Sequence, residues 1–366
     1  MSPDRYAERR LHTLEAAEAA GLGGILVSPG PDLAYLTAYT PPPLERLTLL
    51  VLRAGADPAL VIPTLERPLA ESAAGAPGLT MLEWRDGRDD PYGIVAAMLG
   101  SGRYAVTDRT WASHLLSIER ATPGCSFVAA SEALPLLRAV KDAEEIRRLH
   151  AAGSAADATF ADVIAEPFAG RAETEVAVVL DRLLREHGHQ RVDFTIVGSG
   201  PNGASGHHEP GERRIEPGDA VVMDFGGVRD DYCSDITRTV FVGEPSREER
   251  EVYAIVQAAQ QAAFDAVRPG VAAQDVDRAA RTVITDAGYG DRFVHRTGHG
   301  IGLEVHEPPY IVEGDETLLE PGMTFSDEPG IYLEGRFGVR IEDQVVVIAQ
   351  GAQRLNEANR ELTVVA

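Results

Sequence analysis

Short apolar runs alternate with stretches of helical spacing in the first third of the chain. Consecutive apolar residues predict strands at 24–28, 47–52, 59–62 and 104–107, and residues 91–99 and 113–120 have the spacing of helices. This alternation is typical of an α/β layer structure. We therefore expect an N-terminal α/β domain over residues 1–136.

The pattern changes near residue 137, where a new helical and alanine-rich region begins. Apolar faces predict later helices at 173–187, 246–267 and 273–287. Alternation of apolar and polar residues predicts strands at 220–226, 232–242, 323–332 and 339–348. Ser246 and Glu249 have the spacing of a capping box. Residues 137–366 are therefore predicted to form a second domain.

Composition excludes several classes of protein. The 34 basic and 57 acidic side chains give a formal charge of −23, which repels phosphate backbones and anionic lipid. Nucleic acid and membranes are therefore not expected as partners. Cys125 and Cys233 are too few for a disulfide scaffold. Charges scattered through residues 1–20 argue against a signal peptide, and no run approaches a membrane span, so we expect a cytoplasmic protein.

The predicted strands of the second domain contain carboxylates among apolar residues. Asp224 and Asp235 are separated by glycines and by Asp230 and Asp231, a pattern that suggests a hairpin bringing both acids together. An aspartate in such surroundings is unfavourable without a partner. Taken singly, Asp224 is equally consistent with a strand end, and Asp235 with an ion pair to Arg238.

A glycine-rich segment that follows contains three histidines, His295, His299 and His306. Two further acids, Glu328 and Glu342, lie in segments predicted to be strands. Strand periodicity places Arg340 on the same face as Glu342, where a guanidinium could orient the carboxylate. The residues alone do not decide between Glu342 and its neighbour Asp343.

Four carboxylates and one imidazole form a set suited to two divalent cations. Oxygen ligands favour manganese-like ions, and imidazole also admits cobalt or zinc. Paired cations lower the pKa of a shared water and polarise a carbonyl, which permits hydrolysis without a serine or cysteine nucleophile. The GxSxG pattern of serine hydrolases is absent from the sequence.

In these segments the chain resembles the pita-bread metallopeptidases, and within them the proline-specific branch of prolidases and aminopeptidases P. The matching segments occur in the order VMDFGG, YCSDITRT, TGHGIGLEVHE, DEPGIY and GVRIED. The segment at 137–146 is similar to the opening of the family's catalytic domain, and the preceding region to the creatinase/prolidase N-terminal domain. The resemblance implies an α+β pita-bread domain over residues 137–366 with a curved, mainly antiparallel sheet.

The resemblance also implies roles for the metal ligands. Asp224, Asp235, His299, Glu328 and Glu342 fall on the family's five ligand positions. By this likeness Asp235 and Glu342 bridge two divalent cations, Asp224 completes the first site, and His299 and Glu328 complete the second. Mn²⁺ is the expected ion, with Co²⁺ or Zn²⁺ as alternatives, and a homodimer is the expected assembly.

The remaining candidates are catalytic. His207 falls on the family's mobile histidine, although its neighbour His208 could be the one that faces the site. His295 and His306 match histidines near the substrate, and His306 would stabilise the oxyanion. Glu328 would carry a proton to the proline nitrogen, and Arg340 would act through a carboxylate.

Three positions depart from the family pattern. Gly206 replaces a common proline, Asp327 replaces an apolar residue and adds a negative charge beside Glu328, and Tyr310 stands where dipeptide-specific relatives carry an arginine. The expected activity is cleavage of Xaa-Pro dipeptides or short peptides. Aminopeptidase P action on longer peptides stays open, and so does a catalytically silent binding protein of the same fold.

Overall fold

The computed structural model describes residues 1–206 and 208–366. The chain divides into two compact units, Met1–Arg138 and Ala139–Ala366. No helix among the described residues has the length and apolar character needed to cross a bilayer.

The first unit is built on a six-stranded mixed sheet in the order β4-β3-β2-β1-β5-β6. Side chains alternate across the sheet, so Ile25 and Val27 pack with α1–α3 on one face, whereas Leu26 packs with α4 and α5 on the other. Its elements are α1 (Pro3–Ala19), β1 (Gly24–Val27), α2 (Pro31–Thr37), β2 (Leu49–Arg53), β3 (Ala59–Pro63), η1 (Thr64–Glu66), α3 (Arg67–Ser72), β4 (Thr80–Trp84), α4 (Pro91–Met98), β5 (Gly102–Val106), α5 (Ala112–Ala121), β6 (Cys125–Ala129) and α6 (Ala130–Ala133).

The second unit contains long helices and three sheets. Its elements are α7 (Ala143–Val163), α8 (Glu173–Glu186), β7 (Arg191–Ser199), η2 (Gly200–Ala204), β8 (Ala220–Arg229), β9 (Tyr232–Val242), α9 (Arg247–Ala266), α10 (Ala273–Asp286), η3 (Gly290–Arg292), β10 (Gly298–Gly300), β11 (Glu307–Ile311), β12 (Thr324–Asp327), β13 (Gly330–Leu333), β14 (Phe337–Arg340), β15 (Asp343–Ile348), β16 (Gly351–Arg354) and β17 (Thr363–Val365).

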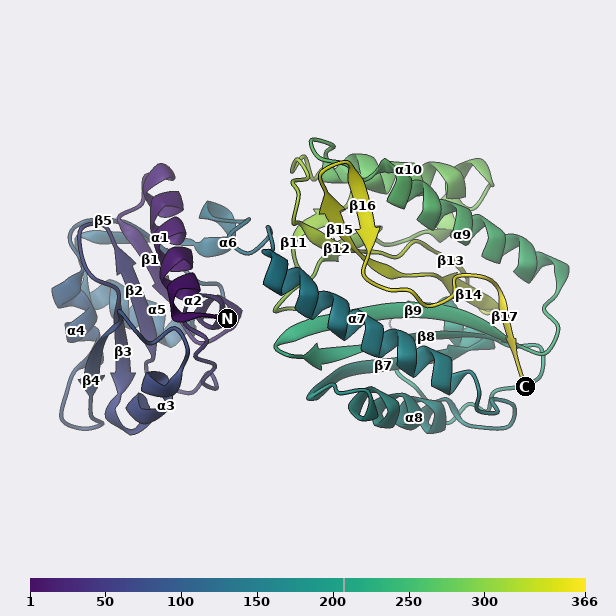
Figure 1. The fold of residues 1–366 in the computed structure, drawn as a ribbon, viewed down its shortest axis with the longest axis horizontal. Coiled ribbons are helices and arrows are strands. Elements are labelled where there is room, and N and C mark those ends of the chain that lie inside the picture. The colour runs from purple at the N-terminus through teal and green to yellow at the C-terminus, as the bar shows by residue number, and fades with distance from the viewer. Residues whose placement is uncertain (207) are drawn as a thin grey trace. The chain divides into compact units, whose positions relative to one another are not determined.

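The sheets of this unit lie between two pairs of helices. Helices α7 and α8 pack on one side, and α9 and α10 on the opposite side (Figure 1). The sheets have the orders β17-β9-β8-β7, β11-β10-β12-β15-β16 and β13-β14. Every neighbouring pair of these strands is antiparallel except β17 and β9. The α+β fold with a mainly antiparallel sheet is therefore confirmed.

Local sequence explains how two parts of this unit form. The β8–β9 hairpin turns at Asp230 and Asp231, whose φ angles are 52° and 72°. Aspartate tolerates this left-handed conformation better than most residues, and two such residues are typical of a tight hairpin. The predicted single strand at 323–332 is instead two strands, since Pro329 lacks an N–H group to continue the ladder.

Candidate active site

The β8–β9 hairpin places the first two acids on one face of the sheet. Asp224 lies opposite Thr237, and Asp235 lies opposite Gly226. The two aspartates are therefore diagonal neighbours across the strands, and their side chains point to the same side. The hairpin expected from the spacing is confirmed.

Three further segments, one strand and two connections between strands, bring their side chains to the same cavity. His299 lies in β10, Glu328 lies between β12 and β13, and Glu342 lies between β14 and β15. Gly298 and Gly300 flank His299, and a Cβ atom at Gly298 would collide with the carbonyl oxygen of Ser326. These glycines let β10 lie close to its neighbours and so position the imidazole.

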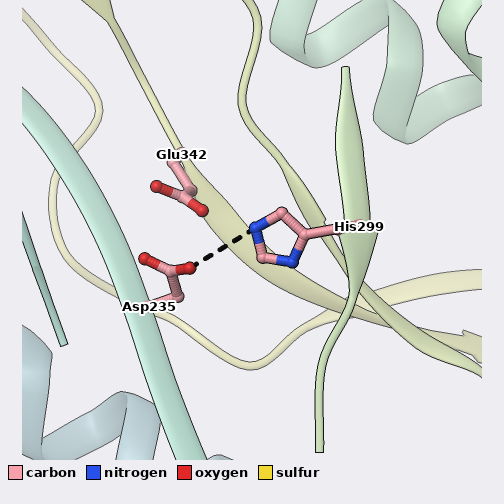
Figure 2. A group of neighbouring side chains, drawn as sticks. All are labelled: Asp235, His299 and Glu342. Atoms are coloured by element: carbon pink, nitrogen blue, oxygen red, sulfur yellow. Dashed lines mark ion pairs between the residues drawn. The ribbon is translucent and has the colours of Figure 1, made fainter. Parts of the chain in front are cut away.

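The carboxylates and the imidazole converge on one point. His299 Nε2 lies 3.6 Å from Asp235 Oδ2 and 3.2 Å from Glu328 Oε1. One ligand atom from each of Asp235, His299 and Glu342 lies within 4.8 Å of the other two. Figure 2 shows these three side chains directed toward one another.

Arg340 has a different partner from the expected one. Its Nη2 donates to Asp224 Oδ2 at 2.6 Å, and its Nε donates to Thr237 Oγ1 at 3.0 Å. The Thr237 hydroxyl in turn donates to Glu342 Oε2 at 2.6 Å. Arg340 and Glu342 both line the cavity, as periodicity predicted, but the guanidinium orients Asp224 directly and reaches Glu342 only through Thr237.

The ion pairs distinguish the surroundings of Glu342 from those of Asp343. Asp343 is fully buried away from the cavity and accepts from Arg238, Arg354 and Arg360. Glu342 lines the cavity instead. The alternative ion pair of Asp235 with Arg238 does not form, because the Arg238 guanidinium is directed to Asp343.

The five predicted ligand residues line a cavity of about 540 Å³ in the second unit. His295 and His306 also line it, with Phe194, Ile196, Val294 and Val305 among its apolar residues. The His306 ring packs edge-on against the His299 ring, with 4.1 Å between centroids. A cavity of this size suits a small ligand.

His295 belongs to a short hydrogen-bonded chain. Its Nε2 lies 2.8 Å from the hydroxyl of Tyr332, which accepts from Arg340 Nη1 at 2.8 Å. Burial raises the pKa of Tyr332, so its hydroxyl stays protonated and can donate to His295. Tyr332 was missed from the sequence, although it follows the DEPGI segment directly.

Of the two adjacent histidines in the 199–211 segment, the structure describes only His208. His207 lies outside the described residues. His208 Nε2 lies 2.8 Å from Glu173 Oε2, and His208 does not belong to the described cavity lining. His208 therefore serves as a structural anchor rather than a cavity residue.

The extra acid beside Glu328 does not enter the cavity. Asp327 lies directly opposite Asp343 in the β12–β15 pair, on the other face of the strand from Ser326 and Glu328. Burial raises the pKa of Asp327 well above its usual range, and Asp343 raises it further. The strand directs this carboxyl away from the cavity, although Glu328 is among the groups that raise the pKa of Asp327.

The electrostatics of the cavity fit bound cations. Asp224 Oδ1 and Glu342 Oε1 are buried without a hydrogen-bond partner. Burial raises the pKa of Asp235 well above its usual range, and the Glu342 and Asp224 carboxylates raise it further. Burial likewise raises the pKa of Glu342. Crowded, partnerless carboxylates of this kind are stabilised by divalent cations, which offset both the desolvation and the mutual repulsion.

Comparisons with known proteins agree with this arrangement. The model of metallopeptidase family M24 matches residues 147–349, and the creatinase/prolidase N-terminal domain matches residues 9–140. The chain belongs to metallopeptidase family M24. It is thus a peptidase whose family uses divalent metal ions, and the pita-bread fold and enzyme class expected from the sequence are confirmed.

Several named proteins are similar over nearly the whole chain. A probable dipeptidase PepE of Mycobacterium tuberculosis is 48% identical over 364 residues, which cover 98% of this chain and 96% of that protein. An Xaa-Pro dipeptidase of Lactobacillus helveticus is 36% identical and covers 91% of this chain and 92% of its own. The crystal structure of dipeptidase PepE from Mycobacterium ulcerans has a TM-score of 0.95 at 47% identity, covering 100% of this chain and 99% of that one.

Proposed function

We propose that this protein hydrolyses the Xaa-Pro bond of dipeptides with the help of two divalent cations. The observation that carries the proposal is the convergence of the five predicted ligands in one cavity: Asp224, Asp235, His299, Glu328 and Glu342. The names of its relatives as dipeptidases and Xaa-Pro dipeptidases support the substrate class.

In this proposal Asp235 and Glu342 would serve both cations, Asp224 would help hold one of them, and His299 with Glu328 would help hold the other. Oxygen-rich ligation favours Mn²⁺, and the single imidazole is compatible with Co²⁺ or Zn²⁺. When bound, the pair of cations polarises the scissile carbonyl and lowers the pKa of water.

The chain's own residues supply positioning and proton transfer. Arg340 holds Asp224 through a charge-assisted hydrogen bond, and Thr237 holds Glu342. Glu328 takes a proton at its carboxylate from the attacking water and passes it to the proline nitrogen, which has no hydrogen in the peptide. His306, beside His299, donates to the developing oxyanion.

The other histidines act around this centre. His295 is fixed by Tyr332 and faces the substrate from the cavity wall. His207, which lies outside the described residues, is proposed as a further catalytic histidine. The apolar side chains of the wall suit a pyrrolidine ring.

Aminopeptidase P action remains the second candidate, because Tyr310 stands where dipeptide-specific relatives carry an arginine. Comparing kcat/KM for an Xaa-Pro dipeptide with that for an Xaa-Pro tripeptide separates the two. A preference for the dipeptide supports the proposal, and a preference for the tripeptide favours aminopeptidase P.

The binding-protein alternative is tested by metal content and activity together. Chelated protein is expected to be inactive, to bind two Mn²⁺ per chain on titration, and to regain dipeptide cleavage. Its melting temperature should rise with Mn²⁺, since a ligand that binds only the folded state stabilises it. A protein that binds no metal and cleaves no dipeptide would instead be a silent member of the fold.

The bridging role of Asp235 has a matched test within the hairpin. Asp235→Asn is expected to lower metal stoichiometry and to abolish the Mn²⁺-dependent rise in melting temperature. Asp231→Asn removes an exposed acid from the turn of the same hairpin and is expected to bind metal like the wild type. Normal stoichiometry in Asp235→Asn would contradict the assignment.

We further propose a homodimer located in the cytoplasm. The negative charge and the sparse cysteines support the location. Light scattering of the purified protein tests the assembly, and fractionation of the source cell tests the compartment.

A further inference from the structure

Arg296 is the feature of the cavity wall that the proposed mechanism does not use. Arg296 and Arg340 both line the described part of the cavity. The Arg340 guanidinium is engaged by Asp224, Tyr332 and Thr237. The Arg296 guanidinium lies over the ring of Tyr310, 4.6 Å from its centroid, and forms no ion pair or hydrogen bond with any described residue.

The position of Arg296 follows from the strand that precedes the metal cluster. Arg296 comes one residue after His295, which lines the cavity, and two residues before β10. Tyr310 lies in β11 directly opposite His299 of β10, so the two side chains share a face of the sheet. The stack of Arg296 on Tyr310 is therefore on the side of the sheet that carries the candidate metal ligand.

The covalent structure of an Xaa-Pro dipeptide determines where its free carboxylate lies relative to the scissile bond. The free carboxylate is attached to the carbon next to the scissile nitrogen, so it enters the same cavity as the scissile bond. The cavity already holds the carboxylates of Asp224, Asp235, Glu328 and Glu342. The two proposed cations would offset these four charges, so the substrate carboxylate finds a positive partner of its own only in a side chain on the wall.

We propose that Arg296 binds the free carboxylate of the substrate and thereby selects dipeptides over longer peptides. This inference rests on the proposed function. A guanidinium is always charged and binds a carboxylate through two parallel N–H donors, while the Tyr310 ring holds its plane by cation–π stacking. The site therefore has an arginine even though position 310 is a tyrosine, because Arg296, in the segment before β10, places its guanidinium over the Tyr310 ring.

The test compares substrates that differ only in the carboxylate. Wild-type enzyme is expected to cleave Ala-Pro faster than Ala-Pro amide. Arg296→Gln should lose about 10- to 100-fold in kcat/KM for Ala-Pro, mostly through KM, and change little for the amide; this is the usual loss for a charge-assisted hydrogen bond. Arg296→Lys should retain part of the preference.

A binding measurement separates this role from catalysis. By calorimetry, proline is expected to bind the wild type more tightly than prolinamide, and Arg296→Gln should remove that difference. Arg292→Gln is the matched control, because Arg292 is an exposed arginine of the same segment that does not line the described cavity. It should keep the preference for the free acid.

The role of the stack is tested at Tyr310. Tyr310→Leu is expected to weaken proline binding, and Tyr310→Phe to weaken it less, because phenylalanine keeps the ring. Equal losses for Ala-Pro and Ala-Pro amide in Arg296→Gln would overturn the proposal and leave the stack as a structural contact. If the wild type cleaves neither substrate, the proposed function fails first.

Discussion

The Nε2 atom of His208 lies 2.8 Å from the Oε2 atom of Glu173, at the first residue of α8. The Glu173 side chain is completely buried. Its carboxylate also accepts from the backbone N–H and hydroxyl of Ser199, from the Asn202 amide and from the backbone N–H of Gly211. One carboxylate therefore fastens the 199–211 segment at several points, and that segment carries the candidate catalytic His207.

Replacing Glu173 should destabilise the fold because several donors lose an ionised acceptor at once. We expect Glu173→Gln to lower the free energy of unfolding by about 2–4 kcal/mol, since each hydrogen bond to a buried charged group contributes strongly. Urea unfolding measures the change. Glu175→Gln, at the exposed capping glutamate of the same helix, should cost at most about 1 kcal/mol. Equal losses in the two variants would contradict the anchoring role.

The same carboxylate predicts a pH dependence of stability. Burial favours the neutral acid, but the hydrogen bonds from Ser199, His208 and Asn202 outweigh it, so the pKa of Glu173 lies below its usual value. Because the pKa is lower in the folded than in the unfolded state, the ionised carboxylate stabilises the fold at pH values above the unfolded pKa of about 4.3. This stabilisation is lost as the pH falls through the folded-state pKa. The difference in unfolding free energy between wild type and Glu173→Gln should narrow below about pH 4.3. Urea titrations at several pH values test this, and a widening difference would contradict it.

Local pattern was sufficient for the parts of the site that are close in sequence. The β8–β9 hairpin could be predicted because its turn lies between Asp224 and Asp235. The residue pattern also offered His299, Glu328 and Glu342 as candidates. Only the resemblance to a family selected His299 among three histidines and Glu342 over Asp343, because long-range strand pairing leaves no signal in the local spacing. The split of the predicted 323–332 strand was missed, although Pro329 marks it.

Partners set by tertiary packing could not be predicted. Periodicity placed Arg340 on the correct face, but only the fold determines that its guanidinium meets Asp224 rather than Glu342. Likewise, nothing local to Glu173 indicates that it receives His208. A charged residue at a helix start is usually a solvated capping group, and here its burial depends on a segment that follows β7.

The hydrogen bond from Arg340 to Asp224 should control metal affinity. We expect Arg340→Lys to weaken binding of Mn²⁺ by about 10- to 100-fold, the usual effect of losing a residue that orients a ligand. Lysine cannot reproduce the three directional contacts to Asp224, Tyr332 and Thr237. Calorimetric titration of the chelated protein measures the affinity. Arg336→Lys is the control in the same hairpin, because Arg336 is paired at the surface with Glu248. An unchanged affinity in Arg340→Lys would show that Asp224 needs no such orientation.

Adjacent acids at 342 and 343 should give opposite phenotypes, because one faces the cavity and the other a cluster of arginines. In Glu342→Gln we expect loss of Mn²⁺ binding at little cost in the unfolding free energy of the chelated protein. In Asp343→Asn we expect a loss of about 3–5 kcal/mol, because Arg238, whose side chain is only 1% exposed, is left as an uncompensated buried charge.

Urea unfolding and metal titration of both variants test this contrast. Glu313→Gln is the control for a surface acid: it removes an exposed partner of Arg278, a pair of the kind that contributes at most about 1 kcal/mol. If Asp343→Asn unfolds like the wild type but fails to bind Mn²⁺, the ligand is Asp343 rather than Glu342. Because Asp343 begins β15 and Glu342 directly precedes it with its side chain toward the cavity, such a result would also require β15 to pair in a register shifted by one residue.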